Sequence, residues 1–276
     1  VTRLPKGTDG YVLKSDSRKP EGLTWGPAGA RQELTSNITV TVGNNGDFPT
    51  INAALENIVA LYYPKYKQGA FYRVTIQLLS GFVMQENVVV ESLDLSWITI
   101  SGIDEETMVV GSAIPTYGWI GGVGFSIFLA KNGGFLPIIN QLFHVDGSGN
   151  PSMVGIYAHT QSRAIVNPGC GIKNVGLHGI RAENNSIIYA PGAITTPTRS
   201  NGGCGIYAVN SSIIYARDVS IATVPGEISF GICADGGSII NASGATVTDI
   251  GQYGILASGG SIINASGATV TDIGQY

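Results

Sequence analysis

The sequence predicts an all-β fold: a right-handed, single-stranded parallel β-helix with an N-terminal capping helix and an extended N-terminal connector. Three observations predict it: a repeat of 23 to 26 residues, period-two alternation of apolar residues inside each repeat, and 39 glycines in 276 residues. A period of roughly 20 to 50 residues is typical of stacked supersecondary units, and alternation is typical of strands. Three short strands joined by tight corners fit one coil, and successive coils pair at about 4.8 Å.

The repeat is marked by a glycine followed by isoleucine, any residue and alanine. A serine stands seven residues after each glycine, and a small apolar residue stands eleven residues after it. The segment 236–253 recurs letter for letter as 259–276. Because chance rarely gives five repeats that agree at three positions, regular coils are expected from about residue 153. The glycines, spaced by 24, 26, 26 and 23 residues, are Gly155, Gly179, Gly205, Gly231 and Gly254.

A single coil is too small to fold alone. Burial of its isoleucines contributes about 5 to 9 kcal/mol, whereas ordering its residues costs on the order of 35 kcal/mol. Each coil therefore depends on its neighbours, and each end of the stack needs a cover. The sequence stops just after the third strand of its last coil. We expect that the natural chain continues past Tyr276 or that another chain covers this end.

Three regions are predicted along the chain. Residues 1–35 are rich in charge, proline and glycine and form a connector with one small hairpin. Residues 36–104 open the β-helix and include its capping helix. Residues 105–276 form the coils, with irregular early coils and a glycine-rich loop around 118–124.

The capping helix is predicted from apolar residues at helical spacing between Ile51 and Tyr62. Thr50, or Asp47 just upstream, can cap its N-terminus, and Pro64 ends it. Strands are expected on either side of this helix. They cover residues 38–42, 74–78, 87–90 and 98–101.

Composition excludes several classes of protein. Charged residues are 12% of the chain, where about 25% is usual, yet 43% hydrophobic residues can fill a core, so disorder is not expected. With 15 Lys+Arg against 19 Asp+Glu there is no basic stripe, and no nucleic-acid partner is predicted. Proline and glycines interrupt the longest uncharged apolar stretch, 108–130, so no membrane span is predicted.

No metal or cofactor is predicted either. Cys170, Cys204 and Cys233 match neither a zinc spacing nor a disulfide framework, so we interpret them as small buried hydrophobes. The three histidines lack ligand-like spacing, and His178 is expected to be at least partly buried. The glycine clusters open no helix, which argues against a phosphate or dinucleotide loop.

Two motifs resemble known families. The pattern Leu-Pro-x-Gly-Thr-Asp-Gly-x-Val-Leu at 4–13, with Gly-Leu-x-Trp at 22–25, resembles the N-terminal connector of bacteriophage tail fibres and tail spikes. The block 42–55, with its run Asp-Phe-Pro-Thr-Ile-Asn-Ala-Ala-Leu, resembles the capping segment of β-helical tail spikes and pectin-esterase-like proteins. The resemblance implies a homotrimeric appendage in the virion tail. It would be attached to other tail or baseplate proteins through residues 1–35 and would bind or trim a host surface polysaccharide.

The chain lacks the catalytic motifs of two known β-helical carbohydrate enzymes. The chain has no Gln-Asp-Thr and no Asp-x-x-x-Gly of the pectin-esterase kind, and no Trp-x-Asp-His of the pectate-lyase kind. A glycosidase needs two carboxyl groups about 5 to 9.5 Å apart. Asp249 and Asp272 occupy equivalent positions in adjacent coils and are the catalytic candidates. The alternative is that each bonds its own corner as an Asx-turn.

A binding surface is the other candidate. Tyr157, Arg181 and Tyr207 each lie two residues after a repeat glycine, between an isoleucine and an alanine that point inward. We therefore expect them to point outward and to align on one face. Aromatic rings beside a guanidinium suit stacking on sugars, and they equally suit a subunit interface. Tyr189 and Tyr215 form a second column with the same two interpretations.

The sequence thus favours a phage tail spike or tail fibre that recognises host surface polysaccharide during adsorption, outside the host cell. One alternative is a tail-spike depolymerase, a glycoside hydrolase or lyase whose acid pair lies between subunits or beyond Tyr276. The other is a bacterial extracellular carbohydrate-active β-helix protein that belongs to no virion.

Overall fold

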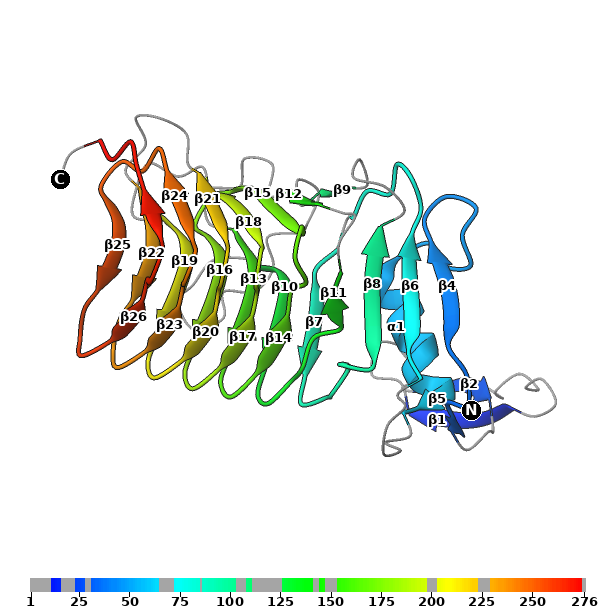
Figure 1. Ribbon diagram of the computed structural model, residues 1–276. Helices are drawn as coiled ribbons and strands as arrows, with labels where there is room; N and C mark the ends of the chain where they lie inside the picture. The colour runs from blue at the N-terminus through cyan, green and yellow to red at the C-terminus, as the bar shows by residue number, and fades with distance from the viewer. Residues whose placement is uncertain are drawn as a thin grey trace.

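The computed structural model is an all-β parallel β-helix, which confirms the predicted fold class (Figure 1). Its coils follow one another from the helix α1 (Ile51–Leu61) to the last coil, which begins with β25 (Tyr253–Ala257). Neighbouring coils pair through parallel strands. The structure describes residues 11–15, 23–27, 31–64, 72–84, 86–102, 108–110, 126–140, 144–146, 153–197, 203–222 and 229–274.

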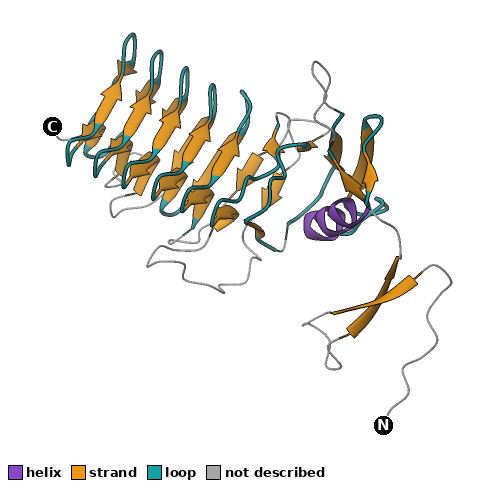
Figure 2. Ribbon diagram, turned by 90° about the horizontal axis from the view of Figure 1, so that it is seen from below, coloured by secondary structure: helices purple, strands orange, loops and turns teal. Residues whose placement is uncertain are grey.

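The N-terminal hairpin predicted for the connector is present. Strands β1 (Tyr11–Ser15) and β2 (Leu23–Pro27) pair antiparallel, and they carry the ends of the two connector motifs. Residues 1–10 and the predicted glycine-rich loop around 118–124 lie outside the described residues. Figure 2 shows the hairpin and the helix at the same end of the chain.

Three parallel sheets form the walls of the coils, and we call them sheets 1, 2 and 3. Sheet 1 begins at the repeat glycines, and sheet 2 follows the serine corner. Sheet 1 contains β7 (Val88–Glu91), β10 (Ser126–Lys131), β13 (Val154–His159), β16 (His178–Glu183), β19 (Gly203–Val209), β22 (Ser229–Ala234) and β25. Sheet 2 contains β14 (Arg163–Ile165), β17 (Ile187–Tyr189), β20 (Ile213–Tyr215), β23 (Ile239–Asn241) and β26 (Ile262–Asn264). Sheet 3 contains β9 (Met108–Val110), β12 (His144–Asp146), β15 (Gly171–Val175), β18 (Ile194–Pro197), β21 (Ser220–Ala222), β24 (Thr246–Thr248) and β27 (Thr269–Val270).

The opening of the β-helix agrees closely with the sequence-based expectation. A four-stranded parallel sheet contains β4 (Ile38–Val42), β6 (Val74–Leu78), β8 (Ile98–Gly102) and β11 (Ile138–Ile139). A short parallel pair, β3 (Gln32–Glu33) and β5 (Tyr62–Tyr63), lies beside α1.

The capping helix begins where predicted and ends slightly earlier. The hydroxyl of Thr50 accepts a hydrogen bond from the backbone N–H of Ala53 at 3.1 Å. Asp47 instead accepts hydrogen bonds from Thr41, so of the two candidate caps Thr50 is the one used. Tyr62 is extended because it pairs in β5, which ends the helix before Pro64. None of the described residues forms a helix with the length and apolar character of a membrane span.

The core is a set of columns, each made of residues that occupy one position in successive coils. In sheet 1 the inward column pairs Ile156 with Ile180, Ile180 with Ile206, and Ile206 with Ile232. All four side chains are fully buried in one continuous cluster. The stacking predicted from the repeat is therefore what buries the apolar surface.

A buried serine ladder fixes the corner between sheets 1 and 2. From Ser186 onward, each serine hydroxyl accepts the backbone N–H of the preceding coil's serine, at 3.0 to 3.2 Å. The hydroxyls of the first two serines donate to the carbonyl three residues earlier. The two residues before each ladder serine have positive φ, which asparagine and glycine adopt most readily. The repeat therefore encodes both the turn and the hydrogen bonds that align it. The ladder residues are Ser162, Ser186, Ser212, Ser238 and Ser261.

The repeat glycines are required by contacts across the core. A Cβ added at Gly205 would lie 2.5 Å from Cγ2 of Ile221 in sheet 3 and 3.0 Å from the carbonyl oxygen of Gly231. The other four repeat glycines meet equivalent obstacles from sheet 3. Glycine at this position lets sheets 1 and 3 approach closely.

We predict that Gly205→Ala destabilises the protein by about 1 to 3 kcal/mol, because the added methyl overpacks the core. Chemical denaturation measures the loss. In the double variant with Ile221→Ala the shortest contact is removed, while those with Thr195 Oγ1 and the Gly231 carbonyl remain. The combined loss should therefore be smaller than the sum of the single losses. A neutral Gly205→Ala, or strictly additive effects, would contradict the close approach.

One polar side chain in the core has no hydrogen bond. Thr195 is fully buried in β18 between Ile172 and Ile221 of the neighbouring coils. Its hydroxyl is the buried side-chain polar atom without a partner in the described part of the chain. Burying an unsatisfied hydroxyl costs about 1 to 3 kcal/mol.

Thr195→Val is therefore expected to raise the free energy of unfolding by about 1 kcal/mol, because valine has the same shape without the unpaired hydroxyl. The exposed Thr246 in the same sheet is the control, and Thr246→Val should change stability by less than about 0.5 kcal/mol. Loss of stability in Thr195→Val would show that the hydroxyl is satisfied.

Candidate functional site

The column Tyr157, Arg181 and Tyr207 lies on the outer face of sheet 1, the side turned away from the core. Tyr157 pairs with Arg181, and Arg181 with Tyr207. The guanidinium carbon of Arg181 lies 5.5 Å from the ring centre of Tyr157 and 5.1 Å from that of Tyr207. The arginine is thus held between two aromatic rings of neighbouring coils, a favourable cation–π arrangement.

The three residues align on one face, as expected, but two of them are covered. Tyr157 is 0% exposed and Arg181 8%, whereas Tyr207 is half-buried. Tyr157 packs with Leu129, Val154 and the half-buried Leu177 in a small apolar cluster outside the main core. Period-two alternation predicts which face of the sheet a residue occupies. It does not predict whether other side chains cover that face.

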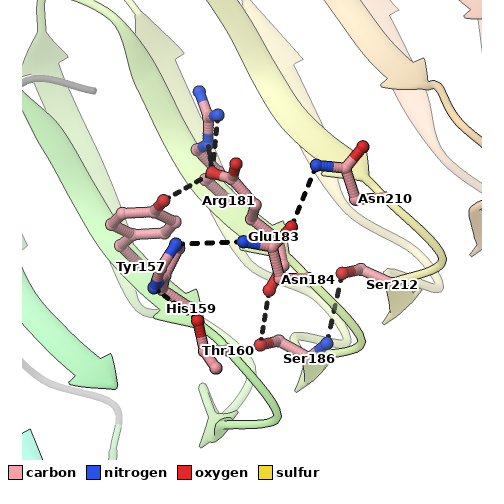
Figure 3. A network of polar contacts seen from close by, with 9 residues as sticks. All are labelled: Tyr157, His159, Thr160, Arg181, Glu183, Asn184, Ser186, Asn210 and Ser212. Carbon is pink, nitrogen blue, oxygen red and sulfur yellow. Dashed lines mark hydrogen bonds and ion pairs between the residues drawn. The ribbon is translucent and has the colours of Figure 1, made fainter. Parts of the chain in front are cut away.

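Glu183 joins the first two members of the column, Tyr157 and Arg181. One of its carboxylate oxygens, Oε2, accepts hydrogen bonds from the Tyr157 hydroxyl and from Nε and Nη2 of Arg181 (Figure 3). The Nη2–Oε2 distance is 2.7 Å, and the two side chains are 10% and 13% exposed. The positive charge of Arg181 and the negative charge of Glu183 therefore neutralise each other in this largely buried position.

These contacts set the protonation states of the cluster. Burial alone raises the pKa of Glu183, but the hydrogen bonds from Tyr157 and Arg181 and the arginine charge outweigh it, so the pKa is lowered overall. Burial and the hydrogen bond to Glu183 raise the pKa of Tyr157. Glu183 is accordingly an ionised acceptor and Tyr157 a neutral donor at neutral pH.

A second polar chain runs beside this cluster, from Asn210 through Asn184 to His159. The amide nitrogen of Asn210 donates to the amide oxygen of Asn184 at 2.9 Å, which directs the Asn184 nitrogen toward Nε2 of His159 at 3.1 Å. Nε2 is therefore an acceptor, and Nδ1 carries the proton and faces the hydroxyl of Thr160 at 2.8 Å. In a charged imidazole Nε2 would also carry a proton, and this N–H would face the N–H of the Asn184 amide, so two donors would meet without an acceptor.

The pKa of His159 is lowered from its ordinary value of 6.5. Burial is the largest cause, and the charge of Arg181 adds to it, while Glu183 opposes both. The asparagine chain acts in the same direction because it presents a donor to Nε2. His159 is thus held neutral at the edge of the cluster.

The acid pair suggested by the sequence occupies a corner. Asp249 and Asp272 have φ of 56° and 54°, and Asn174 has 53° at the corresponding position of an earlier coil. Asp and Asn tolerate this left-handed conformation better than most residues. The local geometry supports a role in turning the chain, the alternative that the sequence left open.

The second tyrosine column is exposed, as its interpretation requires. Tyr189 and Tyr215 pair on sheet 2 and are 43% and 37% exposed. Their rings stack with centres 4.7 Å apart and planes at 9°. They lie on a different wall from Arg181, so the chain presents two separate aromatic surfaces.

Sequence reasoning missed Glu183, His159 and Asn184. A signal was present, because Glu183 follows Arg181 by two residues in the same strand, and residues two apart share a face. His159 and Asn184 lie just before the serine corner, where a side chain reaches its neighbour only once the coils are stacked.

No protein-family model and no curated protein matches the chain. Among solved structures, the chain is similar to a pectin methylesterase from carrot, with 14% identity and a TM-score of 0.47, over 88% of this chain and 90% of that one. It is also similar to a pectin methylesterase from Aspergillus niger, with 10% identity and a TM-score of 0.40, over 90% of this chain and 91% of that one. Likeness at this level carries no conclusion about activity.

The lowered pKa of His159 predicts acid sensitivity. Since the unfolded chain binds a proton at higher pH than the folded one, stability should fall as the pH drops below 6.5. His159→Gln removes this titration, so thermal melting of the variant should change less between about pH 7.5 and 5.5. Both proteins keep His144 and His178, so the difference isolates His159.

Glu183 acts in a separate pH window. Its lowered pKa stabilises the folded state above its ordinary value of 4.5, and this contribution is lost as the pH falls further. Below about pH 4.5 both the wild-type protein and His159→Gln should therefore lose stability. Identical melting profiles of the two proteins above pH 4.5 would contradict the state assigned to His159.

Proposed function

We propose that the protein is a phage tail spike or tail fibre whose β-helix recognises a polysaccharide on the host surface. The observation that carries the proposal is the column on the outer face of sheet 1, where Arg181 is held between Tyr157 and Tyr207 and is fixed by Glu183. Side chains held in place before binding lose little conformational freedom on binding. Tyr207, half-buried, keeps part of its ring available to a ligand.

Recognition is favoured over cleavage by the state of the carboxylate. A general acid in a glycosidase needs a raised pKa, whereas the pKa of Glu183 is lowered and one of its oxygens accepts three hydrogen bonds. Asp249 and Asp272 adopt left-handed corner conformations. A depolymerase is therefore the second candidate, with its acid pair at a subunit boundary or beyond Tyr276.

The virion assignment is supported by the connector motifs at 4–13 and 22–25, which resemble those of tail fibres and tail spikes. Their ends form the antiparallel hairpin β1–β2. We propose that residues 1–35 attach the protein to other tail or baseplate proteins and that three copies assemble. A bacterial extracellular β-helix protein is the alternative, and it would not copurify with phage particles.

Binding to purified host surface polysaccharide tests the proposal. Tyr207→Ala should weaken binding by about tenfold, because an aromatic contact to a ligand is worth roughly 1 to 2 kcal/mol. Tyr72→Ala, which removes an exposed tyrosine near the opposite end of the coils, is the matched control and should bind normally. Thermal melting confirms that both variants are folded.

Two outcomes would overturn the proposal. If the protein binds no host polysaccharide and is absent from purified particles, the tail role is wrong. If new reducing ends appear when protein and polysaccharide are mixed, recognition without cleavage is wrong and the depolymerase is correct.

A further inference from the structure

A pocket of about 250 Å³ opens on the outer face of sheet 1 near its C-terminal strands. It lies between β16, β19, β22 and β25, next to the contact of Arg181 with Tyr207. Pockets for drug-sized ligands measure about 300 to 1,000 Å³. The volume therefore fits one ring-sized unit of a larger molecule.

The floor of the pocket is built from buried side chains. It contains His178, Cys204 and Cys233, which are buried. The hydrogen bond to Cys204, burial and the coulombic interaction with Cys204 raise the pKa of the Cys233 thiol, so it is neither a nucleophile nor a metal ligand at neutral pH. Nδ1 of His178 accepts the backbone N–H of Cys204 at 3.1 Å. Cys233 therefore contributes to the floor as a neutral thiol, and His178 is held by the backbone of the neighbouring strand.

Aromatic rings form the walls. The Tyr207 ring lies 4.9 Å from the His178 ring at an angle of 39°. On the other side Phe230 stacks on Tyr253 with centres 5.8 Å apart and planes at 2°. Both Tyr207 and Phe230 line the pocket, so each is held by a second ring and offers a fixed apolar surface.

The charges around the pocket select against an anionic ligand. Asp235 lines it, and its carboxylate accepts a hydrogen bond from the Ser258 hydroxyl at 2.8 Å. Arg181, which lies over Tyr207, directs Nε and Nη2 to Glu183. Among the described residues that line the pocket there is no lysine or arginine. A carboxylate on the ligand would thus meet the like charge of Asp235 without an unpaired cation nearby.

We propose that this pocket binds one uncharged sugar ring of the glycan, with Phe230 and Tyr207 against its apolar faces and Asp235 accepting hydrogen bonds from its hydroxyl groups. The inference rests on the proposed function and adds the class of sugar. The protein then discriminates neutral glycans from those built of uronic acids. Selectivity comes from like-charge repulsion and from the acceptor that the hydroxyl groups satisfy.

The test uses the full chain with defined monosaccharides. Glucose, galactose and mannose are compared with glucuronic and galacturonic acids by saturation-transfer NMR and titration. Neutral sugars should bind at least tenfold more tightly than the acids. Phe230→Ala should weaken neutral binding by at least tenfold, and Phe230→Leu serves if the alanine variant does not fold. Tyr72→Ala, at an exposed tyrosine that belongs to neither the pocket nor the aromatic columns, is the matched control and should bind as the wild type does.

A second variant tests the charge. Asp235→Asn keeps the shape of the side chain, so it should weaken neutral binding several-fold and strengthen binding of the acids. Equal or tighter binding of the acids by the wild type, or unchanged affinity in Phe230→Ala and Phe230→Leu, would overturn the pocket assignment. If purified host polysaccharide still binds in those cases, only the pocket is wrong. If no glycan binds at all, the proposed function fails with it.

Discussion

The whole structure depends on the in-register stacking of parallel coils. A coil alone buries too little apolar surface to offset the cost of ordering its backbone, so its stability is shared with the coils on either side. Register is set by features that repeat at fixed positions: the glycines that let sheet 3 approach sheet 1, and the serines whose hydroxyls accept N–H groups of the preceding coil. Thr195 is an exception to this pattern, because its hydroxyl has no hydrogen-bond partner and lies in a column that is otherwise apolar.

The candidate site is a consequence of the same stacking. Residues that are 24 to 26 positions apart in sequence become neighbours on the outer face, which brings Arg181 between Tyr157 and Tyr207 and brings Asn184 to His159. Because the backbone is fixed by its neighbours on both sides, these side chains occupy defined positions without a ligand. The same rigidity holds the aromatic walls of the adjoining pocket. A repetitive, preformed surface of this kind suits a polymer that offers similar groups at regular intervals.

The fold was predictable because every coil repeats the same few requirements, and repetition makes a weak local signal strong. The alignment of Tyr157, Arg181 and Tyr207 followed from the same register. The burial of Tyr157 and Arg181 could not be predicted in this way. Alternation indicates which face of a strand a residue occupies, but it does not show which side chains pack over that face. The position of Glu183 on the same face could have been predicted, because it follows Arg181 by two residues in the same strand. The chain of amides that ends at His159 depends on side-chain directions at a corner, which spacing alone does not encode.

Cross-linking tests the stacking most directly. Tyr189 and Tyr215 pair in adjacent strands, about 4.8 Å apart, whereas Asn241 lies one strand further, at about twice that spacing from Tyr189. The pair Tyr189→Cys with Tyr215→Cys should react readily with dibromobimane, which joins thiols only a few ångströms apart, while Tyr189→Cys with Asn241→Cys should not. The natural cysteines are buried and free. Equal reaction of both pairs, or failure of the first, would contradict the in-register coils.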